Sequence, residues 1–317
     1  MTRRWWIALP LVLIGLAWLN TSDPASAASA PKRINKAIEL LEQGQPVYYT
    51  MGMGGYDEGV KMAKTWADII IYDMEHGPLD MTGLREFMRG LVDGGPTKSG
   101  HRTPAVIPQL AAGGWDEATM RANAWMVQQV LATGAHGIHL CHATDPAAVR
   151  VMVEAARYAF HKNGIGAKLG EGRRGSGGQA YGAEIWGVSA EEYLKKADPW
   201  PLNPEGELLL GIKIENKYAL ANAEKTAAVP GIGFGEWGPG DMGISMGFPS
   251  AQEPYPPQMQ QARSRVLAAC KANKVFFLNL VNVDDVEAMI KEGVMVGAGD
   301  EAAAEKGRKF TKRSMPW

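Results

Sequence analysis

Eight short apolar segments alternate with amphipathic runs along the chain, and this alternation restricts the fold more than any other feature. The expected strands lie at 46–51, 67–73, 104–108, 136–142, 207–215, 231–236, 275–280 and 293–298. The expected helices lie at 80–92, 116–132, 144–160, 217–228, 257–273 and 282–292. Almost continuous apolar strands are typical of a parallel sheet covered on both faces. Eight β/α units predict a closed (β/α)8 TIM barrel; the alternative, an open doubly wound sheet, seldom needs eight evenly spread repeats.

A long insertion at about 161–206, after the fourth strand, interrupts the alternation. It opens with the glycine-rich "GIGAKLGEGRRGSGGQAYG" and closes with "ADPWPLNPEGE". Long connections in compact domains are usually functional or disordered, so we expect an enlarged loop that acts as a lid or a subunit-contact arm. A chain of 317 residues, 46% of them hydrophobic, has enough material for one such domain, which we place at 32–313.

The first residues have the three parts of a secretory signal. "MTRRWW" is positively charged, "IALPLVLIGLAWL" (7–19) is apolar, and "ASA" (25–27) offers small residues for cleavage. This order predicts a signal peptide over 1–27 and a periplasmic or secreted protein that leaves the membrane once the signal is removed. A retained anchor is the alternative, but a membrane span needs about 20 apolar residues.

Charge and cysteine content exclude several classes of partner. The formal net charge of −1 gives no reason to expect nucleic acid, and the basic tail "KGRKFTKR" (306–313) is expected to be a solvated helix end. Cys141 ends an expected strand and Cys270 lies in an expected helix, so we expect two unpaired core thiols, although an exported protein could bridge them. The spacing of cysteine and histidine supports no zinc site.

Two short motifs match known sequence signatures but lack the structural context that these signatures require. "GEGRRG" (170–175) fits the dinucleotide-binding pattern but neither follows a strand nor opens an apolar helix. "GISMG" (243–247) fits the nucleophile elbow of α/β-hydrolases, yet no strand runs directly into Ser245. Neither motif therefore predicts the chemistry.

Acidic residues at the ends of several expected strands are more informative. Asp73, Glu75 and His76 end strand two, Glu215 ends strand five, and Asp241 follows strand six. In a barrel these ends converge on one open face. Buried carboxylates are costly unless they are paired or bound to a metal, and an oxygen-rich site suits a hard cation such as Mg²⁺ or Mn²⁺. The alternative is that Glu215 and Asp241 are a helix-cap acid and a turn acid.

Four segments together resemble the HpcH/HpaI aldolase/citrate lyase family. They are "YDMEHGP" (72–78), "ATGAHGIHLCHATDPAAV" (132–149), "IKIENKYALANAEKTAAVPGIG" (212–233) and "GPGDMGISMG" (238–247). The resemblance covers about residues 35–310 in the expected order. It implies a metal-dependent pyruvate aldolase on a (β/α)8 barrel.

Position by position, the resemblance implies roles for five polar residues. Glu215 and Asp241 match the two metal-binding acids of the family, and His76 matches its general base. Asp73 and Glu75 match acids that hold metal-bound water and orient the site. We expect the cation to be Mg²⁺ or Mn²⁺, with Co²⁺ or Zn²⁺ as alternatives.

The substrate pocket has four further candidates. The resemblance implies that the backbone at Gly238 and Pro239 lines the pocket. His142 and Trp237 are candidates for substrate contact, with core packing as the alternative for each.

Three supporting positions depart from the family pattern. Val106 and Ile107 stand where the family has an arginine that holds the keto acid, and Ala132 replaces a supporting Asp. Lys213 replaces a Gln two positions before Glu215, and the period of two predicts that both point into the barrel. Lys213 is therefore expected to supply the missing positive charge. Two alternatives remain: a bulkier, less carboxylate-dependent substrate, and a Schiff base on Lys213, which the surviving metal acids make unnecessary.

The expected activity is that of a carbon–carbon lyase, an aldolase that cleaves or forms a 4-hydroxy-2-oxo acid or a related β-hydroxy carbonyl compound. Its partners would be a 2-oxo acid and an aldehyde, and the resemblance implies a homo-oligomer, a hexamer built as a trimer of dimers. A ligand-binding protein without turnover remains an alternative because supporting residues are missing. An acyl-CoA lyase of the citrate-lyase branch is disfavoured because CoA esters are cytoplasmic.

Overall fold

A computed structural model describes Met1 and residues 32–166, 168–249 and 254–317. Apart from Met1, the predicted signal peptide lies outside these residues. Within the described part of the chain, no helix is both long enough and apolar enough to cross a membrane.

Eight parallel strands form a closed ring, which confirms the predicted TIM barrel. They are β1 (Val47–Gly52), β2 (Ile69–Asp73), β3 (Ala105–Gln109), β4 (Gly137–Leu140), β6 (Leu208–Lys213), β7 (Phe234–Glu236), β8 (Phe276–Leu280) and β9 (Val294–Ala298). The strand β1 pairs with both β2 and β9, and β4 pairs with β6. A two-residue strand, β5 (Pro199–Trp200), pairs with the start of β6. Each of the eight predicted strands overlaps one strand of the ring.

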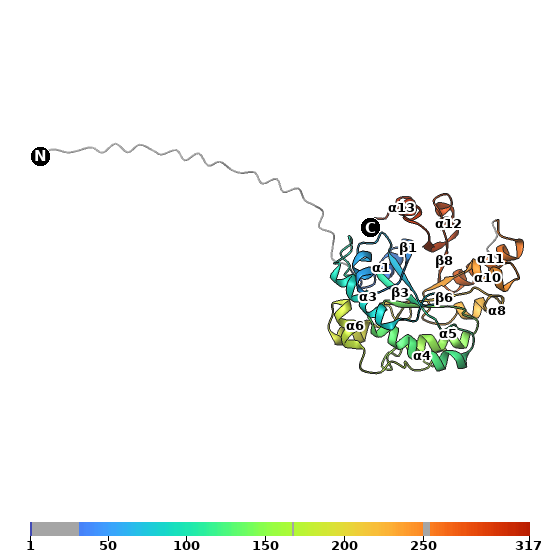
Figure 1. The fold of residues 1–317 in the computed structure, drawn as a ribbon, viewed down its shortest axis with the longest axis horizontal. Coiled ribbons are helices and arrows are strands. Elements are labelled where there is room, and N and C mark those ends of the chain that lie inside the picture. The colour runs from blue at the N-terminus through green and yellow to red at the C-terminus, as the bar shows by residue number, and fades with distance from the viewer. Residues whose placement is uncertain (2–31, 167, 250–253) are drawn as a thin grey trace.

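Helices surround the ring and connect successive strands (Figure 1). They are α1 (Lys36–Glu42), α2 (Tyr56–Met62), α3 (Met81–Asp93), α4 (Glu117–Ala132), α5 (Pro146–Ala156), α6 (Gln179–Trp186), α7 (Ala190–Lys196), α8 (Lys217–Ala221), α9 (Ala223–Ala227), α10 (Pro239–Ser245), α11 (Pro257–Ala272), α12 (Val286–Glu292) and α13 (Glu301–Phe310). Four of the loops that follow strands end in an aspartate whose side chain accepts a backbone N–H of the next helix: Asp80, Asp116, Asp145 and Asp300. This N-cap arrangement explains where α3, α4, α5 and α13 begin.

Two hydrophobic clusters divide the core. Ile70 and Tyr72 face outward against the helices, whereas Ile69 and Ile71 of the same strand face the interior of the ring. This alternation is the side-chain period of a β-strand. Apolar residues of α1 belong to the inner cluster, so this helix covers the N-terminal end of the barrel. The C-terminal ends of the strands are left for the site.

The insertion does not form a lid over those ends. It runs from the end of α5 to the start of β6, and both of these points lie at the N-terminal end of the barrel. The Trp186 indole donates a hydrogen bond to the Gly134 carbonyl (2.8 Å), just before β4. Arg157 and Asp198 form a fully buried ion pair (Nε–Oδ1 2.7 Å) that fastens the two ends of the insertion together. The prediction of a lid was therefore wrong. A segment that follows a helix starts at the N-terminal end of the barrel, opposite the C-terminal ends of the strands.

The basic tail is not solvated as predicted, because two of its arginines are buried against Asp68 at the start of β2. Arg313 Nη1 lies 2.9 Å from Asp68 Oδ1, and Arg308 Nη2 lies 3.3 Å from Oδ2. Lys36 Nζ adds a third cation at 3.1 Å. Burial alone would raise the pKa of Asp68, but the three cations outweigh it and hold this pKa well below its usual range.

Cys141 and Cys270 are both buried and unpaired, as expected. The prediction of two unpaired core thiols is therefore confirmed.

Asp68→Asn is expected to lower the free energy of unfolding by about 3–5 kcal/mol, because it leaves three buried cations without their anion. Chemical denaturation at pH 7 measures the loss, with Asp284→Asn, on an exposed loop, as the matched control. The pKa of Asp68 is lower in the folded state than in the unfolded state. The difference in unfolding free energy between the wild type and Asp68→Asn should therefore persist above about pH 4 and shrink in stronger acid. Equal stability of the two variants would contradict the role given to Asp68.

Candidate active site

Polar side chains occupy the inward positions at the C-terminal ends of the strands. Asp73, Gln109 and His139 are register partners across β2, β3 and β4, and Lys213 is the partner of Glu236 across β6 and β7. Below this layer the interior is apolar. The predicted convergence of strand ends is therefore present, and it places charged groups on an apolar floor where their interactions are poorly screened.

Lys213 lies between two carboxylates. Its Nζ is 2.7 Å from Glu75 Oε2 and 2.9 Å from Glu215 Oε2; the second contact is an ion pair without hydrogen-bond alignment. Both Lys213 and Glu215 point into the barrel, as the period of two predicts. Burial favours the neutral amine, but Glu236 and the neighbouring acids outweigh it and raise the pKa of Lys213 above its usual range. Burial raises the pKa of Glu215, and Lys213 opposes this rise.

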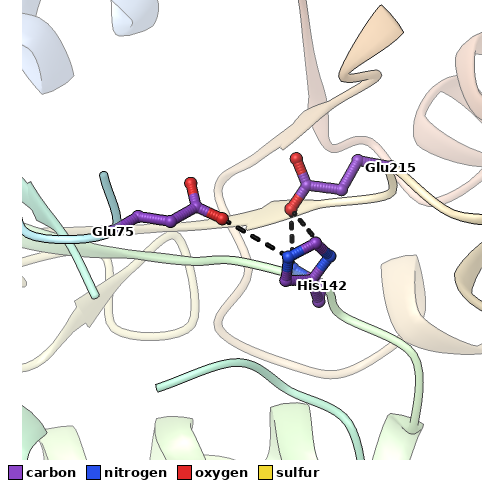
Figure 2. Close-up of side chains that lie close together, drawn as sticks. All are labelled: Glu75, His142 and Glu215. Atoms are coloured by element: carbon purple, nitrogen blue, oxygen red, sulfur yellow. Dashed lines mark hydrogen bonds and ion pairs between the residues drawn. The ribbon is translucent and has the colours of Figure 1, made fainter. Parts of the chain in front are cut away.

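His142 contacts the other oxygen of each carboxylate (Figure 2). Its Nδ1 lies 3.4 Å from Glu215 Oε1 and its Nε2 lies 3.5 Å from Glu75 Oε1. The backbone N–H of His142 also donates to Glu215 Oε1 (2.8 Å). His142 has a φ of 46°, a left-handed conformation that is uncommon outside glycine and is often found at functional sites.

Glu75, His142 and Glu215 form a set of donors suited to a divalent cation. One donor atom from each lies within 4.8 Å of the others. Because Lys213 contacts the Oε2 atoms, the Oε1 atoms face the imidazole. Two carboxylates and one imidazole fit Mn²⁺ or a similar first-row ion, and the carboxylates also suit Mg²⁺. Asp241, the predicted partner of Glu215, lies in the first turn of α10 and outside this group of three.

His76 is held by Asp73 at the edge of the same cluster. The two side chains meet at 3.1 Å (Nδ1–Oδ2), while Asp73 Oδ1 accepts the backbone N–H groups of Glu75 and His76. These hydrogen bonds lower the pKa of Asp73, although burial opposes them. The imidazole is 61% exposed, and its Nε2 lies 3.7 Å from Glu75 Oε2. Asp73 thus orients His76 through Nδ1, while Nε2 is on the side of the ring that faces Glu75.

Gln109 and the pair of Glu236 and His139 were not predicted as part of the site. Gln109 donates a hydrogen bond to Glu75 Oε2, on the side facing Lys213. Glu236 Oε2 lies 3.3 Å from His139 Nε2; burial raises the pKa of Glu236 to about 7 and lowers that of His139 well below its usual value. Gln109 ends strand three. The expectation that residues at strand ends converge on the open face, which identified Asp73, would therefore also have identified Gln109.

The segment 237–239 contributes backbone rather than side chains. A Cβ on Gly238 would lie 2.8 Å from Glu215 Oε2, so glycine lets the start of α10 approach this carboxylate. Pro239 is the first residue of α10. Trp237 is only 1% exposed and packs edge-on against Tyr255 (5.1 Å between ring centres). Its indole is therefore part of the core, and the predicted substrate contact has no support in this geometry.

Lys213→Met is expected to destabilise the metal-free protein by about 3 kcal/mol or more, because Glu75 and Glu215 lose their shared cation. The variant should also bind Mn²⁺ at least about tenfold more tightly, since the repulsion between the ammonium and the metal ion is gone. Thermal denaturation with and without Mn²⁺, together with calorimetric titration, measures both effects. Lys225→Met, in the short outer helix α9, is the control. Unchanged metal affinity would show that the charge of Lys213 does not oppose metal binding.

Comparison with protein-family models and curated proteins gives consistent matches. A family model described as HpcH/HpaI aldolase/citrate lyase matches residues 102–299. A hydroxypyruvate/pyruvate aldolase from Sagittula stellata is 25% identical over 201 residues, which cover 63% of this chain and 64% of that protein. The chain thus spans less than two thirds of the length of the curated relatives it matches.

Solved structures share the barrel over most of their length. An HpcH/HpaI aldolase/citrate lyase family protein from Burkholderia cenocepacia matches with a TM-score of 0.64 at 19% identity, covering 87% of this chain and 97% of that one. A citrate lyase beta subunit from M. tuberculosis, complexed with oxaloacetate and magnesium, matches with a TM-score of 0.50 at 14% identity, covering 84% and 97%. At these identities the likeness shows the fold.

Proposed function

The chain belongs to the HpcH/HpaI aldolase/citrate lyase family, and on that premise we propose that it is a metal-dependent carbon–carbon lyase. Its substrate would be a 4-hydroxy-2-oxo acid or a related β-hydroxy carbonyl compound. The observation that carries the proposal is the meeting of Glu75, His142 and Glu215 beside His76 at the open end of the barrel. The hydroxypyruvate/pyruvate aldolase named among the relatives supports the same class of reaction.

Glu75, His142 and Glu215 would hold the metal, with Asp241 as a further candidate from α10. The magnesium and oxaloacetate in the related citrate lyase structure support this choice of cofactor and ligand. A divalent cation bound there supplies Lewis acidity, which polarises the ketone of a 2-oxo acid and stabilises negative charge on its oxygen. The fit rests on the chemistry of the donor set: two acids and an imidazole whose ligand atoms face one another.

His76 would act as the general base during cleavage. Asp73 fixes the tautomer with the proton on Nδ1, so Nε2 accepts the proton of the substrate's 4-hydroxyl group. The C3–C4 bond then breaks, the C4 fragment leaves as an aldehyde, and the electron pair stays with the 2-oxo acid fragment. That fragment takes up a proton at C3, which balances the reaction.

Lys213 would supply fixed positive charge to the site. Ile107 faces the apolar interior of the ring, in the strand where the family pattern has its arginine. The ammonium of Lys213 lies against the two acids of the cluster and can offset charge on a bound 2-oxo acid. The contacts of Nζ with both carboxylates favour the charged amine, which argues against a nucleophilic Schiff-base role.

Glu215→Gln is expected to reduce kcat/KM for aldol cleavage at least about a hundredfold and to weaken Mn²⁺ binding, because the buried carboxylate loses its charge. Chelation of the wild-type protein should abolish activity, and added Mn²⁺ or Mg²⁺ should restore it. Aldehyde release from a panel of 4-hydroxy-2-oxo acids, followed by a coupled dehydrogenase, provides the measurement. Glu205→Gln, on an exposed turn, is the matched control.

Full activity after exhaustive chelation, or in Glu215→Gln, would rule out the metal mechanism. His76→Ala provides a separate test, since it should lose cleavage while keeping metal affinity. Tight binding of 2-oxo acids without turnover of any member of the panel would instead favour the ligand-binding alternative.

A further inference from the structure

We infer that Trp115 determines which aldehyde the site accepts, and that it selects an aromatic or similarly flat apolar one. This inference rests on the proposed function and concerns the half of the substrate that lies away from the 2-oxo acid. It follows from the position of Trp115, from the way its loop is held, and from the apolar rim of the barrel.

Trp115 lies directly against the candidate metal cluster. Its indole stacks on the His142 ring, with ring centres 4.5 Å apart and planes 22° apart. His142 in turn contacts Glu75 and Glu215. Despite this packing Trp115 remains 46% exposed. A substrate that reaches the cluster therefore meets open indole surface beside it, and a flat apolar group gains both buried area and ring stacking there.

The loop that carries Trp115 is built to hold the indole in place. A Cβ on Gly113 would lie 2.7 Å from the indole Nε1, so glycine makes room for the ring. Gly114 N–H donates to the Cys141 carbonyl (2.8 Å), and the Gly114 carbonyl accepts the Thr144 N–H (2.9 Å). These bonds tie the loop to the segment that carries His142. An exposed side chain fixed in this way loses little conformational freedom when a ligand binds.

Other exposed apolar side chains lie at the same end of the barrel as Trp115. They come from the loops after β1 and β2, from α10, and from the end of β8. The exposed members are Met53, Leu79, Ile244 and Leu280. A charged centre with an apolar rim matches a substrate whose oxo-acid end is polar and whose other end is not.

The experiment compares two aldehydes in aldol addition to pyruvate by the full chain loaded with Mn²⁺. Wild-type protein should use benzaldehyde with a higher kcat/KM than glycolaldehyde. Trp115→Ala should lose about tenfold or more for benzaldehyde but less than about threefold for glycolaldehyde, because only the aromatic partner uses the ring. Trp115→Phe should recover most of the loss. Trp125→Ala, which removes a 48% exposed tryptophan of α4, is the matched control and should change neither value.

Exchange of the pyruvate methyl protons in D₂O, followed by NMR, separates the inference from the proposed function. Exchange reports proton removal from pyruvate and needs no aldehyde, so Trp115→Ala should retain it. Absence of exchange in the wild-type protein would overturn the proposed function and the inference with it. Exchange without a benzaldehyde preference, an equal loss for both aldehydes, or a loss explained by a change in oligomeric state on size exclusion would overturn the inference alone.

Discussion

Closure of the sheet between β4 and β6 is the constraint on which the rest of the structure depends. Once the ring is closed, each strand has to send alternate side chains inward and outward, and the inward set has to fill a narrow interior. The lower part is filled by aliphatic and aromatic groups and is covered by α1. The fixed ring also brings Glu75 and Lys213, which are 138 positions apart in the sequence, into direct contact.

The charge balance at the open end follows from that geometry. Glu75, Glu215 and Glu236 all act on the single ammonium of Lys213. Desolvation makes each carboxylate costly, so these acids need either protons or further positive charge. Burial raises the pKa of Glu236, which favours its protonated form. Glu75 and Glu215 instead have oxygens that face one another and can bind a cation. The excess of acid over base is thus itself a reason for this site to attract metal.

Much of the fold and part of the site could be predicted because both depend on local patterns. Apolar runs of strand length predicted the eight strands. The topology of a barrel then predicted that Asp73, Glu75, His76 and Glu215 lie at one end. The partners of a buried charge could not be predicted, because Asp68 and Arg313 are each ordinary in their own segments and meet only in three dimensions. The location of the insertion could have been predicted, because a segment that follows a helix begins at the end of the barrel where the next strand starts. Nor does the sequence show that Trp237 is enclosed whereas Trp115 is open.

The cluster around Asp68 has a consequence for how the chain reaches its native state. Lys36 lies near the start of the domain, whereas Arg313 lies 245 positions beyond Asp68, almost at the end of the chain. The strands β1 and β9 also pair with each other. Lys36 precedes Asp68, but a chain still being synthesised can neither add the two arginines to this cluster nor complete the ring until β9 and residues 308–313 have emerged. Contacts between such distant segments slow folding, so the molecule acquires its stability late and as a whole.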